Sequence, residues 1–370
     1  MRTTILNGTL LDTTTMTMLG ERHLTIEDDL IVEVSETRPV GEADRSIDAE
    51  GAFLLPGFID AHVHHVITTM DFARLRTISE VERVLGMARL AEGNLSRGFT
   101  TVRDTGGDVA GLIEAIANGL CNGPRIVAAG RPISQTGGHG DFDAADSEGC
   151  GCEIRTTYMS QVADGVDAVR KAVRSELRAG SQFIKIMASG GVASPTDPFD
   201  AIQYTADEIA AATVETDHRH TYTTAHAYQS EAIALAIDNG VRCIEHGNLV
   251  DSATAAQMAE MGVTMVPTLV TYAAMSEMGA KAGMPQANLE KNQGVFEHGQ
   301  SSITVAKKAG VDLGFGTDLL GEAQPWQNRE FAIRANLEPA ADVLRSMYVV
   351  NPGLCGLQGQ IGVLTPGAFA

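Results

Sequence analysis

Short apolar runs that alternate with helical patterns constrain the fold of this chain more than any other feature. From residue 53 onward, each apolar run is followed by a longer segment with the apolar spacing of an amphipathic helix. Eight such strand–helix units are typical of a (β/α)8 TIM barrel, a parallel α/β fold. An open doubly wound sheet is the alternative, but no Gly-x-Gly-x-x-Gly motif opens the first unit. The predicted strands are 53–59, 100–103, 125–129, 183–187, 221–225, 241–244, 264–269 and 311–316.

The segments between these runs predict helices, several of which open at Ser or Asp and close at Gly or Asn. Before residue 53 the sequence pattern differs. Short strand patterns at 3–11, 23–26 and 30–34 are separated by Asn-Gly and Asp-Asp turn signals. The chain therefore predicts a small β domain ahead of the barrel. The predicted helices are 80–97, 165–179, 207–217, 230–239, 252–261 and 295–309.

Charge and composition exclude several classes of partner. The formal net charge of −20 over 370 residues argues against nucleic acid, which requires basic surface. The N-terminus lacks a signal-peptide pattern, and no apolar stretch is long enough for a membrane span, which predicts a cytoplasmic protein without a membrane partner. The five cysteines form no regular framework, as is usual in a reducing compartment. Cys150 and Cys152 could bind metal or form a strained disulfide, and we favour neither.

Polar residues at the ends of the predicted strands point to a metal site. His62 and His64 follow the first apolar run, and strand alternation directs both to the same side. Taken singly, each residue has an ordinary explanation, because buried histidines pack in cores, aspartates cap helices and lysines extend to solvent. A barrel, however, gathers all strand ends at one mouth, where converging imidazoles suit a divalent metal. The six candidate ligands are His62, His64, Lys185, His226, His246 and Asp318.

This series resembles the binuclear-metal amidohydrolase superfamily. The finer pattern resembles its imidazolonepropionase-like branch, which includes microbial Xaa-Pro and Xaa-Arg dipeptidases and carboxypeptidases. The longest matching segment is the lysine segment, Ile184-Lys-Ile-Met-Ala-Ser-Gly-Gly-Val-Ala-Ser-Pro-Thr-Asp. The other segments that carry the resemblance are 57–64, 100–104, 134–140, 225–228, 244–248 and 314–323.

The resemblance implies a role for each candidate ligand. The first two histidines and the aspartate would bind the more buried metal ion, and the other two histidines would bind the second. Lys185, carboxylated by carbon dioxide, would bridge both ions, which would also resolve the cost of an amine in an apolar strand. Zinc is the expected metal, since nitrogen-rich sites suit it. A pair of ions would lower the pKa of a water molecule and polarise the substrate carbonyl.

Three further implications concern catalysis and substrate. Asp318 would move a proton from the nucleophile to the leaving amine. His139, in a Gly-rich loop, resembles the family histidine that supports the oxyanion, and Tyr228 resembles the tyrosine that holds a substrate α-carboxylate. The expected substrate is therefore a dipeptide or an N-acyl amino acid, cleaved before its free C-terminal residue. The segment from Val266 onward carries no acidic residue until Glu277, which favours an apolar or proline side chain over arginine.

Two rival interpretations stay open. The chain could be a cyclic amide hydrolase of the imidazolonepropionase type, although the loop with His139 and the residue Tyr228 favour the peptidase-like branch. From a different class, it could be a metal-free structural barrel; relatives of that kind lose ligands, whereas all six candidates are present here.

The resemblance also predicts the domain boundaries. Residues 1–52 with 352–370 would form a small β-sandwich-like domain, and residues 53–351 the barrel. In the family, the motif at 361–370 is followed by further strands, which this chain lacks. We therefore expect an unpaired sheet edge, which would favour aggregation or provide a contact for a homo-oligomer.

Overall fold

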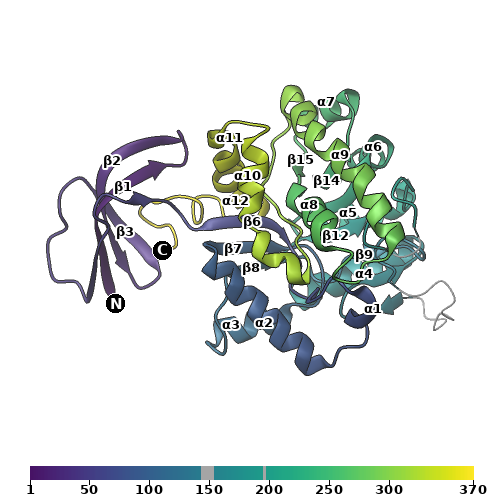
Figure 1. Cartoon of the computed structure of the whole chain (residues 1–370), viewed down its shortest axis with the longest axis horizontal. Coiled ribbons are helices and arrows are strands. Elements are labelled where there is room, and N and C mark those ends of the chain that lie inside the picture. Colours follow the sequence, from purple (N-terminus) through teal and green to yellow (C-terminus); the bar gives the residue numbers. More distant parts are fainter. Residues whose placement is uncertain (143–153, 195–196) are drawn as a thin grey trace. The chain divides into compact units, whose positions relative to one another are not determined.

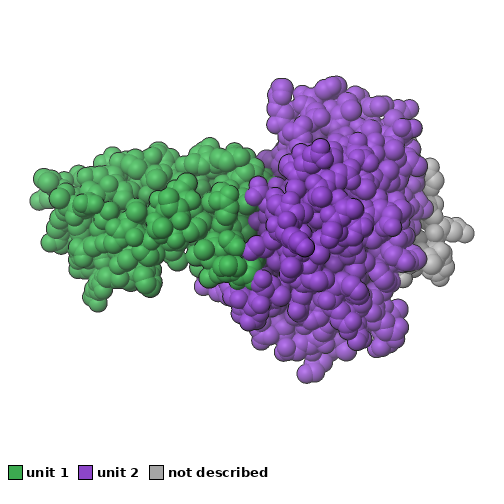
Figure 2. All heavy atoms as spheres, turned by 90° about the horizontal axis from the view of Figure 1, so that it is seen from above, with its two compact units in different colours: residues 1–59, 338–370 green, residues 60–337 purple. Residues whose placement is uncertain are grey.

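The chain divides into two compact units. The computed structural model describes residues 1–142, 154–194 and 197–370, so Cys150 and Cys152 lie outside the described residues. One unit comprises Met1–Ile59 with Glu338–Ala370, and the other Asp60–Leu337 (Figure 2). These boundaries differ from the predicted ones because residues flanking 52 and 351 bond within the first unit. Asn351, for example, donates a 2.8 Å hydrogen bond to the carbonyl of Ile59.

The first unit is built on one five-stranded sheet rather than on two packed sheets. Its strand order is β3-β2-β1-β4, and β5 also pairs with β1. One face packs with the C-terminal segment in an apolar cluster of Leu10, Leu24, Ile31 and Ala368. The elements of this unit are β1 (Arg2–Asp12), β2 (Thr17–Glu27), β3 (Leu30–Ser35), β4 (Arg45–Asp48), β5 (Phe53–Leu54), α11 (Ala340–Arg345), the π-helical turn η2 (Ser346–Val350) and α12 (Asn351–Leu354).

The last residues of the chain cover part of the edge strand β3. The amide of Ile31 donates to the carbonyl of Ala368 at 2.9 Å, and the amide of Gly367 donates to the carbonyl of Ile31 at 2.8 Å. The amide of Ala370 likewise bonds Asp29 at 2.9 Å. The prediction of an unpaired edge is therefore wrong for the start of β3.

The strands of the second unit follow one another in a ring (Figure 1). β6, β7 and β8 are neighbours in one sheet, and β9, β12, β13, β14 and β15 in another. The amide of Gln182 bonds the carbonyl of Ala128 at 2.9 Å and links the two sheets. On the other side, Gly314 bonds Met265 and Ala61 bonds Phe315, both at 2.8 Å. The strands are β6 (Phe58–Val63), β7 (Phe99–Asp104), β8 (Arg125–Ala128), β9 (Ile133–Ser134), β10 (Ile154–Thr156), β11 (Gln161–Ala163), β12 (Ile184–Met187), β13 (Thr223–Gln229), β14 (Cys243–Leu249) and β15 (Thr264–Val266).

This arrangement is a TIM-barrel-like α/β fold in which helices alternate with the strands. Several helices begin and end where local sequence signals predict. Ser79 caps α2 by accepting a hydrogen bond from the amide of Glu82, and Asp251 caps α7 in the same way through Thr254. The helices are α1 (Phe72–Leu75), α2 (Glu80–Ser96), α3 (Ala110–Ala117), α4 (Val166–Ala179), α5 (Ala206–Asp217), α6 (Ser230–Asp238), α7 (Ser252–Glu260), α8 (Leu269–Met278), α9 (Gln286–Ala309), the 3-10 helix η1 (Gly321–Trp326) and α10 (Arg329–Ala335).

Several predicted elements differ in the structure. The predicted strand 53–59 is divided between β5 and β6, and the predicted helix 295–309 is only the later part of α9. The predicted strand 264–269 ends at Val266 because α8 begins at Leu269. Residues 311–316 form single backbone bonds and one bridge, Leu313 to Met265, instead of a regular strand. Within the described ranges, no helix combines the length and apolar character needed to cross a membrane.

Candidate metal centre

One pocket gathers every side chain that the sequence predicts for the site. The side chains come from the carboxyl ends of β6, β12, β13 and β14 and from the segments that follow β9 and Leu313. The pocket has an empty volume of about 660 Å³, and its remaining lining is mostly apolar. The predicted residues that line it are His62, His64, His139, Lys185, His226, Tyr228, His246 and Asp318.

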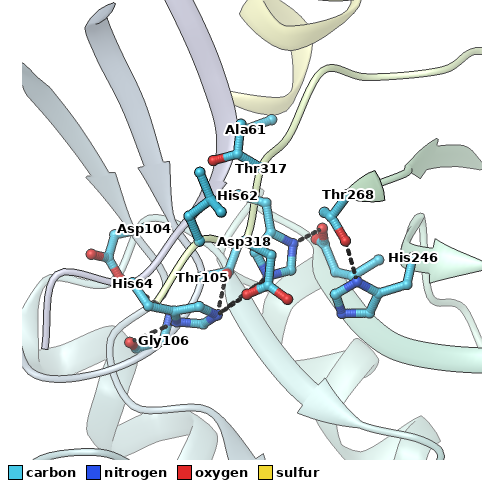
Figure 3. A network of polar contacts seen from close by, with 12 residues as sticks. Ala61, His62, His64, Asp104, Thr105, Gly106, His246, Thr268, Thr317 and Asp318 are labelled. Carbon is cyan, nitrogen blue, oxygen red and sulfur yellow. Dashed lines mark hydrogen bonds and ion pairs between the residues drawn. The ribbon is translucent and has the colours of Figure 1, made fainter. Parts of the chain in front are cut away.

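Three of the predicted ligands meet at the carboxyl end of β6 (Figure 3). The Nε2 atoms of His62 and His64 are 3.3 Å apart. The Oδ1 atom of Asp318 lies 3.5 Å from the first and 3.2 Å from the second. Ligand atoms of His62, His246 and Asp318 all lie within 4.8 Å of one another. The spacing fits a single cation at this point.

Hydrogen bonds orient the first two imidazoles for metal binding. His62 Nδ1 lies 2.7 Å from Glu245 Oε2, and His64 Nδ1 lies 3.1 Å from the carbonyl of Gly106. Both partner oxygens can only accept a hydrogen bond, so Nδ1 carries the proton in each ring and Nε2 carries the lone pair. A metal-ligating histidine generally makes this second contact with a carboxylate or a carbonyl.

The other two predicted ligands, His226 and His246, lie on the neighbouring strands β13 and β14. His226 donates from Nε2 to the carbonyl of Gly190 at 3.0 Å, which leaves Nδ1 for a ligand, and His246 Nδ1 contacts the hydroxyl of Thr268 at 2.8 Å. Their ring centroids are 4.7 Å apart. Burial holds the pKa of both imidazoles well below the usual value. Neutral imidazoles are the form that binds a metal.

Lys185, the predicted bridging residue, lies on β12. Its side chain is 2% exposed, and burial lowers the pKa of its amine. Burial raises the pKa of the Asp318 carboxyl group, but its contacts with His62 and His64 outweigh burial and place this pKa below the ordinary value. Imidazole nitrogens with one fixed tautomer, together with a carboxylate, are a donor set that suits zinc. The residues present therefore fit a divalent metal ion, and the ligand atoms of His62, His246 and Asp318 are close enough to share one.

Two of the ligands lie in backbone conformations that are unusual for residues with side chains. His246 has φ 74° and Asp318 has φ 50°. Such left-handed residues cost about 1–3 kcal/mol and cluster at functional sites. The amide of Asp318 is held by a 2.8 Å bond to the carbonyl of His62. A Cβ at Gly316 would lie 2.8 Å from Cβ of His62, so the close approach requires glycine there.

Sequence reasoning missed a buried ion pair beneath the ligands. Arg103 and Glu245 are both fully buried, and the guanidinium forms a short ion pair with Glu245 Oε1. Arg103 also donates to the carbonyl of Ala61 at 2.6 Å and to the hydroxyl of Tyr222 at 2.8 Å. Glu245 in turn holds His62. The sequence signal that could have revealed this pair is a charged residue inside each of two apolar strands, Arg103 in β7 and Glu245 in β14.

Glu245→Gln is expected to weaken metal binding about 10–100-fold, the usual effect of changing an outer-shell partner of a ligand. The neutral glutamine side chain would leave Arg103 without its anionic partner. It would also weaken the hydrogen bond that keeps the proton on Nδ1 of His62. Metal affinity is measured by competition with a chromophoric chelator. Glu297→Gln, on the exposed face of α9, is the matched control. Unchanged affinity in the Glu245 variant would remove its orienting role.

A second buried carboxyl group makes stability depend on pH. Glu330 accepts a hydrogen bond from the amide of Val270 at 2.7 Å at the start of α8, and burial raises its pKa from the ordinary 4.5 to about 8. Between these values the folded state holds a proton that the unfolded chain releases, so stability falls as pH rises. Glu330→Gln should flatten this dependence and raise the free energy of unfolding above pH ~8. Urea unfolding of both proteins across this pH range, at fixed metal loading, measures it; parallel curves would contradict the assignment.

His139 and Tyr228 lie next to the second pair of histidines. The ring of His139 stacks on that of His226 at 4.1 Å, and its Nδ1 contacts the hydroxyl of Ser194 at 2.8 Å. A Cβ at Gly191 would lie only 2.0 Å from this ring, so glycine makes room for it. The hydroxyl of Tyr228 is 3.3 Å from that of Tyr272, and burial raises its pKa. Tyr228 is thus a neutral phenol facing the pocket.

The family model for the amidohydrolase family matches residues 53–370. The chain belongs to this family. It is 44% identical to a prolidase crystallised with N-methylphosphonate-L-proline, with a TM-score of 0.95, covering 100% of this chain and 91% of that one. It is 27% identical to a Xaa-Pro dipeptidase crystallised with methionine in its active site, with a TM-score of 0.90 and coverage of 100% and 92%.

Another relative is ochratoxinase from Aspergillus niger. It is 29% identical over 299 residues, which are 77% of this chain and 62% of the relative. The chain thus spans less than two thirds of that protein's length. Membership of the family and the hydrolases among its relatives support an enzyme that acts on amide bonds.

Proposed function

We propose that the chain is a binuclear-metal hydrolase that cleaves the amide bond before a free C-terminal residue, in dipeptides or N-acyl amino acids. The observation that carries this proposal is the neutral hydroxyl of Tyr228 beside the two groups of ligand side chains. A phenol can donate a hydrogen bond to a substrate carboxylate next to the scissile bond. The neighbouring prolidase structure with a proline-based phosphonate supports the same substrate class.

Each polar residue then has a task. Two zinc ions would supply Lewis acidity and lower the pKa of the attacking water. Asp318 would accept the proton of that water and deliver it to the leaving amine. When Ser194 donates to Nδ1 of His139, the ring proton lies on Nε2, which can donate to the developing oxyanion. Lys185, carboxylated by carbon dioxide, would place an anion between the two groups of histidines.

The test is a hydrolysis screen with zinc-loaded protein. The substrates are dipeptides and N-acyl amino acids that differ in the C-terminal residue, together with their C-terminal amides. We expect cleavage of the free acids and loss of at least ~10-fold in kcat/KM for the amides, because the phenol then faces no carboxylate. The apolar lining of the pocket favours proline or an apolar C-terminal residue over arginine.

Two outcomes would replace the proposal. Cleavage of cyclic amides alone would assign the chain to the imidazolonepropionase-type reaction. Absence of both bound metal and hydrolysis would favour the structural barrel. The acid–amide comparison separates the first case, because a lactam substrate does not need a free α-carboxylate.

A further inference from the structure

A stacked pair of phenylalanine rings lies in the pocket wall and has no task in the proposed reaction. The ring centroids of Phe72 and Phe142 are 5.7 Å apart, and the planes are inclined by only 9°. Both rings line the pocket that holds the ligand side chains. The apolar side chains of Val66, Ile67 and Leu320 line the same pocket. We take these five pocket-lining side chains as a candidate surface for an apolar group and call them the phenylalanine wall.

Hydrogen bonds hold the segment that carries Phe72. The carboxylate of Glu322 accepts from the hydroxyl of Thr69 and from the amide of Met70, both at 2.8 Å. The amide of Gly321 bonds the carbonyl of Ile67 at 3.0 Å, which brings Leu320 to the wall. Asp71 caps α1, directly before the ring of Phe72. The wall is therefore formed before any substrate binds.

Phe142 is attached to the same region. Arg76, which follows α1, donates to the carbonyl of Phe142 at 2.9 Å. The hydroxyl of Tyr158 bonds the carbonyl of Leu75, the last residue of α1, at 2.5 Å. Both rings thus belong to segments that hydrogen bonds connect to α1, so their stacking does not depend on a ligand. A preformed apolar surface binds without a cost of ordering it.

The phenylalanine wall lies across the ring of strands from Tyr228, which assigns it to the acyl half of the substrate. β8 and β9 both border β12 and so share the third position of the ring, and residues 311–316 occupy the eighth. Phe72 therefore follows the first position, β6, whereas Tyr228 lies at the end of the fifth, β13. In a ring of eight strands the first and the fifth lie opposite each other. If Tyr228 holds the C-terminal carboxylate, the acyl half of the substrate extends across the metal ligands toward Phe72. This step rests on the proposed function.

We propose that the phenylalanine wall is an acyl-side subsite that selects a large apolar or aromatic group on the carbonyl side of the scissile bond. The group is an aromatic acyl substituent or the apolar side chain of an N-terminal residue. An aromatic ring buries apolar area there and can pack against the stacked pair. A charged group would lose its hydration against five apolar side chains.

The experiment compares N-acetyl and N-phenylacetyl derivatives of the C-terminal amino acid that the screen favours. We expect kcat/KM to be at least ~10-fold higher for the phenylacetyl compound, since even one methylene in an apolar pocket contributes 10-fold or more. The double variant Phe72→Ala/Phe142→Ala should bring this ratio close to one. Phe53→Ala, at a ring that is 71% exposed in the first unit, is the matched control and should keep the ratio.

Two results would overturn the subsite. One is a wild-type ratio of one or less, and the other is an unchanged ratio in a double variant with normal circular dichroism. Should the double variant fail to fold, Phe72→Leu and Phe142→Leu replace it, and each should lower the ratio. Calorimetric binding of N-methyl- and N-benzylphosphonate-L-proline to the wild type gives a second readout. Tighter binding of the benzyl compound supports the subsite, and equal or weaker binding contradicts it.

The outcomes separate the subsite from the proposed function. If the enzyme cleaves N-acyl amino acids without preferring the phenylacetyl compound, only the subsite is wrong. If it cleaves neither, the proposed function is wrong.

Discussion

Asp318→Asn is expected to lower kcat by about 10²–10⁴-fold, the usual contribution of a positioned general acid–base group. The asparagine side chain cannot accept and return the proton that the carboxylate would move. The fold should survive, because asparagine tolerates the left-handed conformation that Asp318 adopts at φ 50°. The change should therefore appear in kcat far more than in the melting temperature.

Steady-state kinetics and thermal melting with matched zinc content test this expectation. Asp312→Asn is the matched control, because Asp312 is exposed and precedes the same ligand by only a few residues. Its kinetics should equal those of the wild type. Turnover by the Asp318 variant within ~10-fold of the wild type would assign proton transfer to another group.

Lys185→Met is expected to abolish turnover by removing the anion proposed to join the two groups of histidines. Methionine is unbranched and apolar, so it fills a similar volume in a β12 position that is only 2% exposed. Without the carboxylated amine, bound zinc should fall from two ions to one or none. The variant should still fold, since it exchanges a buried amine for an apolar group of similar shape.

Metal content after dialysis and carbon NMR of protein equilibrated with ¹³C-bicarbonate test this prediction. The wild type should show a carbamate signal that the variant lacks. Lys281→Met, at an exposed position after α8, is the control and should keep both the metal and the signal. Two bound ions and normal turnover in the Lys185 variant would contradict the bridging role.

Helix starts could be predicted from the sequence, whereas strands with partners distant in the chain could not. The helix starts at Ser79 and Asp251 could be predicted, because capping depends on residues only three positions apart. The late strand at 311–316 could not be described correctly, because its backbone bonds to Met265 and Ala61 depend on neighbours distant in sequence. The edge strand β3 is a similar case, since its partner is the far end of the chain.

The candidate site shows the same division. Residue types and strand ends were enough to nominate His62, His64 and Asp318, because alternation along one strand and the mouth of a barrel are general rules. Those rules say nothing of the contacts beneath the site. The ion pair of Arg103 with Glu245 joins β7 to β14 and is not encoded in any local pattern.

The sequence by itself therefore determined the strand–helix alternation and the set of polar residues that a barrel would gather. Only the tertiary structure decided which nitrogen of His62, His64 and His226 is free to bind metal, because their partners Glu245, Gly106 and Gly190 come from other strands and loops. It also brought Phe72 and Phe142 into one wall, since ring stacking depends on where two separate segments meet. Local propensity acts over a few residues, whereas tautomers and pocket walls depend on contacts between segments far apart in the chain.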